Sequence, residues 1–495
     1  MTLRLRGGVS NLLFMLVLVV YAAVSIRSAA ASPLTYDQIY TVYLSQFHTP
    51  GQLWDWLSAG TDLNPPLNYL LTHLAFRSFG VSPLTARLPA MTAYGGAVLL
   101  TFVYLRLRHR SEAAGWFGGL ALLACNLPFY AVIARAYALM VFWGTASLLL
   151  WYLAHTAVSA GRRASAAIGL GGVVAAGVYT HYYCVFVLVP ISMAEITRLV
   201  TTGRFNKEVV LAVVAGTASA VGLLPLIQTA RDFSSGFWRR PSWGDIELCY
   251  GNILLNAAIP LFVAAAAAYL VRRPDPPREA EPADRVANAA VVGFLVIPVA
   301  GLILAKLSTG AFDKRYVIMG YLGAVGVFGG LAARALKASR VATGIVVVAL
   351  LGWWLLGAEL RYRKRADEMR QFEQTVMVVR EFAAGGPVVV IAPDLFLSIA
   401  YAEPNLRGRL VYPADRRRAM ELIRSDTDDR NLIQLARAAP GLAVRAFDDC
   451  PLQIGAVVVG DWWQRIAWGK MGYRFEPAGA SGSKVAAIRV TARPK

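Results

Sequence analysis

The residues with the clearest capacity for chemistry lie in one polar loop near the start of the chain. This loop, residues 30–64, carries Asp37 beside Tyr36 and continues through Asp55 to Asp62. A carboxylate held at the mouth of a membrane bundle can accept a proton from a substrate hydroxyl or amine. An aspartate in an exposed loop is more often a solvated cap or turn residue, so Asp37 gains weight only from the groups around it.

Cations occur at two further places that are bounded by apolar sequence. Arg135 lies between apolar stretches, and Lys314 and Arg315 precede Tyr316 at the start of a late apolar segment. Arginine suits phosphate because its planar fork can bind two oxygens at once. The alternative is that these side chains snorkel to lipid headgroups. One carboxylate together with several such cations is the set that a reaction on an anionic lipid needs.

The sequence offers little support for a metal site. His181, followed by Tyr182, is interpreted first as an interfacial hydrogen-bonding residue. No His, Asp and Glu cluster with ligand spacing occurs, and the 4 cysteines show neither CxxC nor metal spacing, although a disulfide between Cys249 and Cys450 stays open. We predict no metal and no cofactor, with a divalent metal only as an alternative clamp for a phosphate.

The elements that must position these residues are membrane helices. A chain of 495 residues with 57% hydrophobic residues and a mean hydropathy of +0.49 is too apolar for a soluble protein and too long for one anchor. A span needs about 20 apolar residues, and about eleven such runs are predicted. They cover approximately 12–26, 84–105, 114–134, 137–158, 164–180, 182–199, 208–229, 248–271, 287–306, 316–333 and 341–358. Residues 65–80, which begin with Pro65-Pro66, are predicted as a shorter juxtamembrane helix.

The distribution of charge predicts the orientation of the bundle. Although the net charge is +19, the cations do not form one basic face with interleaved aromatics, which argues against a nucleic-acid partner. They gather in alternate loops instead, as the positive-inside bias requires, so the N-terminus is predicted to be cytoplasmic and, with an odd number of spans, the C-terminus outside. The first apolar run also resembles a cleaved signal peptide, but a retained span is favoured because many membrane helices follow it.

The composition changes after Glu359. We predict a transmembrane domain at 1–359 and a small soluble α/β domain at 360–495, outside the cytoplasm. Residues 387–392 and 454–460 are predicted as buried strands, with 409–412 and 485–490 as further candidates. Neither buried strand ends in a glycine-rich phosphate fingerprint, so the tail carries no support for nucleotide binding.

Several scattered motifs resemble those of bacterial GT-C glycosyltransferases, in particular the family-39-like enzymes related to protein O-mannosyltransferases and the lipid A aminoarabinose transferase. The resemblance covers roughly residues 30–330 and implies a GT-C membrane fold of about 11–13 helices. The motifs are Tyr36-Asp37-Gln38, Asp62-Leu63-Asn64-Pro65-Pro66-Leu67-Asn68-Tyr69, Arg87-Leu88-Pro89, Ala134-Arg135-Ala136-Tyr137-Ala138-Leu139, Thr180-His181-Tyr182 and Arg315-Tyr316.

The resemblance implies a function and roles for these residues. The family transfers a sugar from a polyprenyl phosphate to an acceptor at the outer face of the membrane, with inversion. Asp37 is then the general base, and a glycan, a lipid or a protein is the unknown acceptor. The residues implied to bind the donor phosphate are Arg135, Lys314, Arg315 and Tyr316. Those implied to bind substrate are Tyr36, Asp62, Asn64, Tyr69, Tyr137, His181 and Tyr182. The implied location is the bacterial inner membrane.

Two departures from the family pattern keep other functions open. Gln38 stands where the family usually has Glu, and Asn64 stands where it has His or Lys. A relative that binds a glycolipid without catalysis would tolerate both changes. A transporter or flippase for a polyprenyl-linked sugar would need the same cations but no base. Transporters often carry internal repeats and polar residues at mid-membrane, whereas neither is evident here.

Overall fold

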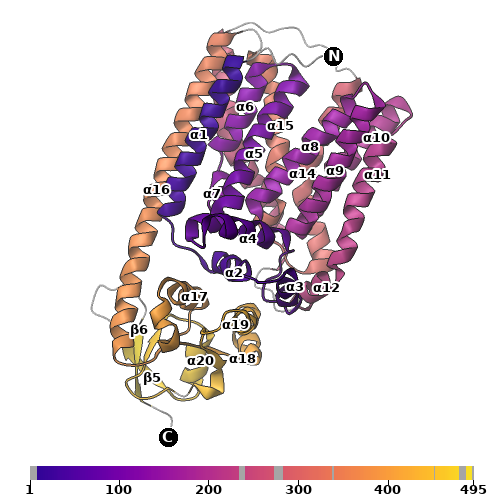
Figure 1. Cartoon of the computed structure of the whole chain (residues 1–495). Coiled ribbons are helices and arrows are strands. Elements are labelled where there is room, and N and C mark those ends of the chain that lie inside the picture. Colours follow the sequence, from indigo (N-terminus) through magenta and orange to yellow (C-terminus); the bar gives the residue numbers. More distant parts are fainter. Residues whose placement is uncertain are drawn as a thin grey trace.

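The computed structural model describes residues 8–233, 240–271, 282–336, 339–450, 452–478 and 487–492. It is a helical bundle with a small α/β unit at one end (Figure 1). Within the described ranges, 8 helical segments are long and apolar enough to cross a membrane, so the chain is a multi-pass membrane protein. Those segments are formed by α1 (Gly8–Ala30), α5 (Pro83–His109), α8 (Tyr137–Thr156), η1 with α10 (Tyr182–Val187, Leu188–Thr202), α11 with η2 and α12 (Lys207–Ala218, Ser219–Leu223, Leu224–Asp232), α13 (Gly244–Val271), α14 (Pro282–Leu304) and α16 (Arg340–Ala384).

Three further predicted spans fall on shorter or less apolar helices. These are α6 (Glu112–Ala124), α9 (Ala160–Thr180) and α15 (Gly320–Leu336). The span predicted over 114–134 is too long, because Cys125 is extended (φ −86°, ψ −176°) and Pro128 begins a separate turn, α7 (Pro128–Ala131). The close packing of α10 on α14 depends on Gly293, where an added Cβ would lie 2.4 Å from the Cα of Pro190.

The basic clusters predicted for the inner loops gather at the end of the bundle away from the α/β unit. Arg106, at the end of α5, donates to Asn11 in α1 at 2.5 Å and pairs with Glu112. Arg108 contacts Asn288 near the start of α14. Arg4, Arg6, Arg272, Arg273 and Arg278, which belong to two further basic clusters of the sequence, lie outside the described residues. We call the opposite end, next to the α/β unit, the site end.

Three short helices cross the site end, between the bundle and the α/β unit: α2 (Tyr36–Leu44), α3 (Pro50–Ser58) and α4 (Leu67–Phe79) (Figure 1). The predicted juxtamembrane helix is confirmed as α4, which starts after Pro66 and stops at Gly80, whose φ of 79° suits glycine. Leu74 and Phe79 on α4 are 61% and 71% exposed, as expected of a helix that lies at a membrane boundary.

The chain leaves the membrane through α16. This helix is 45 residues long, or about 68 Å at 1.5 Å per residue, and it is continuous through residue 359, where the predicted domain division falls. Its first part is apolar, whereas charged residues dominate from Glu359 onward. It therefore connects the bundle to the α/β unit as one continuous helix (Figure 1).

The α/β unit contains one sheet of six strands: β1 (Val388–Val390), β2 (Leu410–Ala414), β3 (Val444–Ala446), β4 (Val457–Val459), β5 (Arg474–Pro477) and β6 (Ala487–Ala492). Their order in the sheet is β3-β2-β1-β4-β6-β5. The first four strands in that order are parallel, and β6 and β5 are antiparallel. The predicted strands are confirmed as β1, β4, β2 and β6. The helices of this unit are α17 (Pro393–Ala402), η6 (Pro404–Arg409), α18 (Arg416–Ile423), α19 (Thr427–Ala438), η7 (Phe447–Asp449) and α20 (Trp463–Lys470).

The α/β unit and α2 share one hydrophobic cluster. Ile39 and Val42 of α2 are fully buried in it, together with Phe396 and Leu397 of α17 and Val379 of α16. Burial of apolar surface stabilises this contact, so the helix that carries Asp37 is held between the membrane bundle and the tail.

Arg87 fixes the connection from α1 to α2. Its side chain is completely buried in α5 and donates to the carbonyl oxygens of Ala29 (2.6 Å), Ser32 (3.1 Å) and Pro33 (2.9 Å). Its Nε donates to the side-chain oxygen of Gln38 at 3.0 Å. Four hydrogen-bond acceptors between Ala29 and Gln38 are therefore bonded to the guanidinium group of Arg87.

We predict that Arg87→Leu lowers the thermal stability of the detergent-solubilised protein by several degrees. The change leaves buried carbonyl groups without donors, each at a cost of about 1–3 kcal/mol. Arg77→Leu is the matched control, because Arg77 is exposed near the end of α4. Equal melting temperatures for Arg87→Leu and Arg77→Leu would contradict this role.

Candidate functional site

A buried ion pair lies at the centre of the site end. Asp62 and Arg135 are paired, with 11% and 9% of their side chains exposed. A second Arg135 nitrogen lies 3.3 Å from Asp62, and Arg135 also donates to the backbone carbonyl of Asp37 at 3.2 Å. Burial alone raises the pKa of Asp62, but the charge and hydrogen bonds of Arg135 outweigh that effect and hold the pKa below its ordinary value. Asp62 is therefore a carboxylate that serves to fix Arg135.

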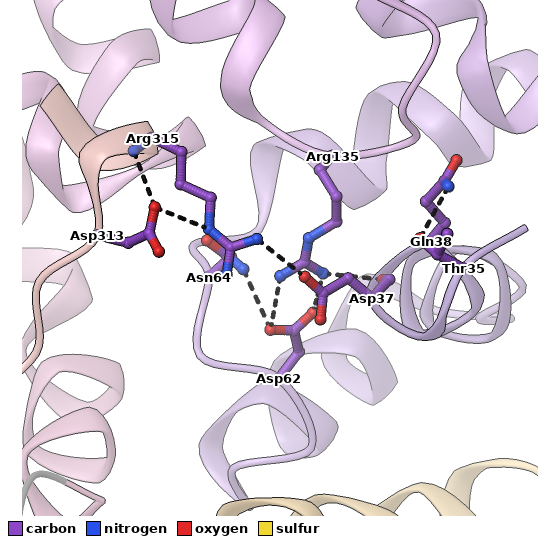
Figure 2. A network of polar contacts seen from close by, with 8 residues as sticks. All are labelled: Thr35, Asp37, Gln38, Asp62, Asn64, Arg135, Asp313 and Arg315. Atoms are coloured by element: carbon purple, nitrogen blue, oxygen red, sulfur yellow. Dashed lines mark hydrogen bonds and ion pairs between the residues drawn. The ribbon is translucent and has the colours of Figure 1, made fainter. Parts of the chain in front are cut away.

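The carboxylate of Asp37 faces a different arginine. Its Oδ2 lies 3.3 Å from Nη1 of Arg315, with 40% and 24% of the two side chains exposed. Figure 2 shows the guanidinium groups of Arg315 and Arg135 close to the Asp37 and Asp62 carboxylates. Asp313 orients Arg315, because its side chain accepts from the Arg315 backbone N–H at 3.0 Å and lies 3.7 Å from Nε. The Asp37 side chain is thus more accessible than that of Asp62.

Aromatic rings surround Arg315 on the side of the bundle. Its guanidinium carbon lies 5.3 Å from the ring centre of Tyr137 and 5.8 Å from that of Tyr316. The His181 ring lies 5.2 Å from that of Tyr316, and its Nδ1 accepts from the backbone N–H of Tyr183 at 3.2 Å. Burial, with Arg135 and Arg315 nearby, moves the pKa of His181 well below its usual range. His181 is therefore a neutral residue that positions the rings it packs against, those of Tyr137, Tyr183 and Tyr316.

Gln38, the departure from the family pattern, does not face Asp37. Its side-chain oxygen accepts from Nε of Arg87 and from the backbone N–H of Ala134, both at 3.0 Å, and its amide donates to Thr35. It is 3% exposed. Gln38 therefore joins α2 to α5 and to the loop that carries Arg135.

The remaining residues predicted for the site lie in several different places. Asn64 donates to Asp62 at 3.1 Å, and Tyr69 is fully buried beside it. Tyr36 bonds Tyr40 at 3.0 Å and borders the α/β unit. Tyr182 packs with a separate apolar cluster around Leu44, and Lys314 faces a separate cavity.

Two cavities lie at the site end, and Asp37 lines one of them. The acidic cavity, of about 360 Å³, lies between α2 and the α/β unit. The basic cavity, of about 530 Å³, lies between the α6–α7 loop, α13, α15 and α16. Tyr130 lines the basic cavity and packs edge-on against Tyr137, over which Arg315 lies. The acidic cavity is lined by Pro33, Leu34, Thr35, Tyr36, Asp37, Phe372, Asp394 and Ser398. The basic cavity is lined by Asn126, Leu127, Phe129, Tyr130, Cys249, Asn252, Ile253, Lys314, Val317, Ile318, Tyr321, Arg361 and Lys364.

Sequence reasoning missed several residues at these cavities. Arg361 and Lys364 follow the last predicted span on the side where the charge bias predicts few cations, and this signal was available in the sequence. Asp394 and Tyr130 carried no such signal. Among the described residues, no group of at least three His, Cys, Asp or Glu is arranged to hold a metal, and no disulfide joins any two of the four cysteines.

The fold and this site can be compared with known proteins. The chain is a multi-pass membrane protein whose fold matches that of solved structures. It is similar to ArnT from Cupriavidus metallidurans in the apo state, with 14% identity over 96% of this chain and 97% of that chain and a TM-score of 0.61. The same enzyme bound to undecaprenyl phosphate gives a TM-score of 0.58 at 14% identity and the same coverage. No protein-family model and no curated protein matches the sequence.

The α/β unit adds two carboxylates close to α2, at the start of α19, of which Asp429 is buried and Asp428 is partly buried. Burial is the main cause that raises the pKa of Asp428 to about 6, with Asp37 and Asp394 adding to it. Burial likewise raises the pKa of Asp429 to about 7, although Trp463 and the backbone N–H of Asp415 donate to it at 3.0 Å.

We predict that α19 becomes less stable as the pH rises. A carboxyl whose folded pKa exceeds its unfolded value of about 3.9 binds protons more tightly in the folded state. Its contribution is present below pH 4 and is lost as the pH passes through about 7. Amide hydrogen exchange of α19 should therefore quicken between pH 5 and pH 8, after correction for the intrinsic exchange rate.

Asp429→Asn should weaken this pH dependence, whereas Asp461→Asn should not, because Asp461 is 62% exposed. An unchanged pH dependence in Asp429→Asn would show that another group is responsible.

Proposed function

We propose that the protein is a glycosyltransferase that moves a sugar from a polyprenyl phosphate to an acceptor, with Asp37 as the general base. The observation that carries this proposal is the contact between Asp37 and Arg315, which are 278 residues apart in the chain and remain partly exposed, with Asp37 lining the acidic cavity. The GT-C fold supports it, as does the solved complex of ArnT with undecaprenyl phosphate. The proposed reaction takes place outside the cytoplasm, at the inner membrane of a bacterium.

The proposed step is a single displacement at the anomeric carbon. The acceptor oxygen or nitrogen forms the new bond to this carbon while its proton passes to the Asp37 carboxylate. The bond between the anomeric carbon and the phosphate oxygen breaks, and polyprenyl phosphate leaves with the electron pair. Attack opposite the leaving group inverts the configuration. No general acid is required, because the phosphate is stable as an anion.

Arg315 has two alternative anionic partners in this scheme. Without substrate, it holds the Asp37 carboxylate at 3.3 Å. A donor phosphate competes for the same guanidinium, and its arrival frees Asp37 to accept a proton. Charge placed where negative charge develops is often the largest catalytic contribution. Arg135, by contrast, is occupied by Asp62 and by the Asp37 carbonyl, so we assign it to positioning rather than to the donor.

The basic cavity is the proposed binding site for the donor phosphate. Lys314, Arg361 and Lys364 contribute three cations, and apolar residues such as Val317 and Ile318 line the same space. Lys364 has a distant partner, Glu368, at 3.9 Å, and among the described residues neither Lys314 nor Arg361 is paired with a carboxylate. A phosphate with a prenyl chain matches this combination of charge and apolar surface.

The first test replaces the proposed base. Asp37→Asn should reduce sugar transfer by about 10²- to 10⁴-fold, the usual contribution of general-base catalysis, and should leave binding of undecaprenyl phosphate within a few-fold of wild type. The assay follows the release of undecaprenyl phosphate and the labelled sugar in membranes. Asp55→Asn, in the same loop and exposed, is the matched control and should keep full activity. Normal turnover by Asp37→Asn would remove Asp37 from this role.

The second test concerns the donor phosphate. Arg361→Ala should weaken binding of undecaprenyl phosphate by about tenfold or more, because a hydrogen bond to a charged group contributes about 1.5–3 kcal/mol and 1.4 kcal/mol is tenfold in affinity. Arg363→Ala is the control on the same helix, since Arg363 is 71% exposed, pairs with Glu359 and does not line the cavity. Equal affinities for the two variants would exclude the basic cavity.

A further inference from the structure

A third, largely apolar space lies next to the acidic cavity. This groove, of about 690 Å³, separates the ends of α1 and the start of α5 from the outer part of α16 and from α17. Leu34, Leu84, Phe372, Val376 and Met377 supply much of its lining. Its size exceeds that of the basic cavity, and it opens where α1 leaves the bundle.

The groove adjoins the acidic cavity that Asp37 lines. Pro33, Leu34, Phe372 and Ser398 line both spaces. A molecule that occupies the groove can therefore extend one end to the Asp37 carboxylate along a single path.

The mouth of the groove lies at the membrane boundary. Ala29 and Ala30 are the last residues of α1, and Pro83 and Leu84 are the first of α5. Just before α5, Phe79 and Val81 are 71% and 52% exposed. Exposed apolar side chains at the end of a bundle are suited to the interfacial layer of lipid, so the groove is open to molecules anchored there.

The charge of this path differs from that of the basic cavity. Its one lining cation, Arg380, is paired with Glu403 at 2.7 Å. Closer to Asp37 the lining adds Asp394. A phosphate that moved along this path would meet carboxylates, whereas a hydroxyl or a protonated amine would not be repelled.

We infer that the acceptor is a lipid-anchored molecule with a free hydroxyl or amine, and that it reaches Asp37 through the groove between α1 and α16. Its apolar part lies along Val376 and Met377, and its reacting end passes Asp394 to Asp37. The donor approaches from the opposite, basic side. This inference rests on the proposed function and adds the chemical class of the acceptor and its route.

Photo-crosslinking tests the occupant directly. A benzophenone amino acid placed at Met377, in the full-length protein in its native membranes, should capture a lipid with a hydroxyl or amine headgroup, identified by the intact mass of the adduct. Met377 is 54% exposed, so the substitution does not disturb the core. The same amino acid at Gln374, which is exposed and outside the groove, should give at most a tenth of that adduct. A peptide adduct, a polyprenyl phosphate adduct, or equal lipid capture at both positions would overturn the inference.

A kinetic arm separates this inference from the proposed function. In membranes that contain the native acceptor, Met377→Glu should reduce transfer at least fivefold while the affinity for undecaprenyl phosphate stays at the wild-type value. Gln374→Glu should transfer normally. Normal transfer by Met377→Glu would refute the groove while the glycosyltransferase proposal stands. Failure of the wild-type protein to release undecaprenyl phosphate and move sugar would refute the proposed function itself.

Discussion

The buried guanidinium of Arg135 determines where the first loop can lie. A charge taken out of water must be paired, and loss of its partner is strongly destabilising. Arg135 meets this requirement with the Asp62 carboxylate and the backbone carbonyl of Asp37. Both ends of the loop are thereby attached to one side chain. The position of the Asp37 carboxylate, and its encounter with Arg315, follow from this attachment.

The structure gives Asp37 and Asp62 different surroundings, although both acids lie in one loop of the sequence. Asp62 is sequestered with Arg135, whereas Asp37 remains accessible in the acidic cavity. The acidic cavity and the basic cavity carry opposite charges and therefore favour different substrates. The α/β unit completes the acidic side, since Asp394 and the α17 residues that pack on α2 come from the tail.

Local pattern in the sequence was sufficient for the helical membrane fold, for α4 and for several strands, because apolar runs and proline positions act within one element. Motif resemblance brought Asp37, Arg135 and Arg315 into one group. The pairing of each arginine with its acid depends on packing across hundreds of residues and could not be predicted locally. The same holds for Gln38, which bonds Arg87, and for Lys314, which lines the basic cavity while its neighbour Arg315 contacts Asp37.

The most direct measurement is a cryo-EM structure of the protein bound to undecaprenyl phosphate. The phosphate should lie at the mouth of the basic cavity within 4 Å of a charged nitrogen of Arg315, with the Asp37 carboxylate released from that nitrogen and facing the acidic cavity. A phosphate bound in the groove between α1 and α16, or an unaltered Asp37–Arg315 contact with the lipid elsewhere, would contradict the account.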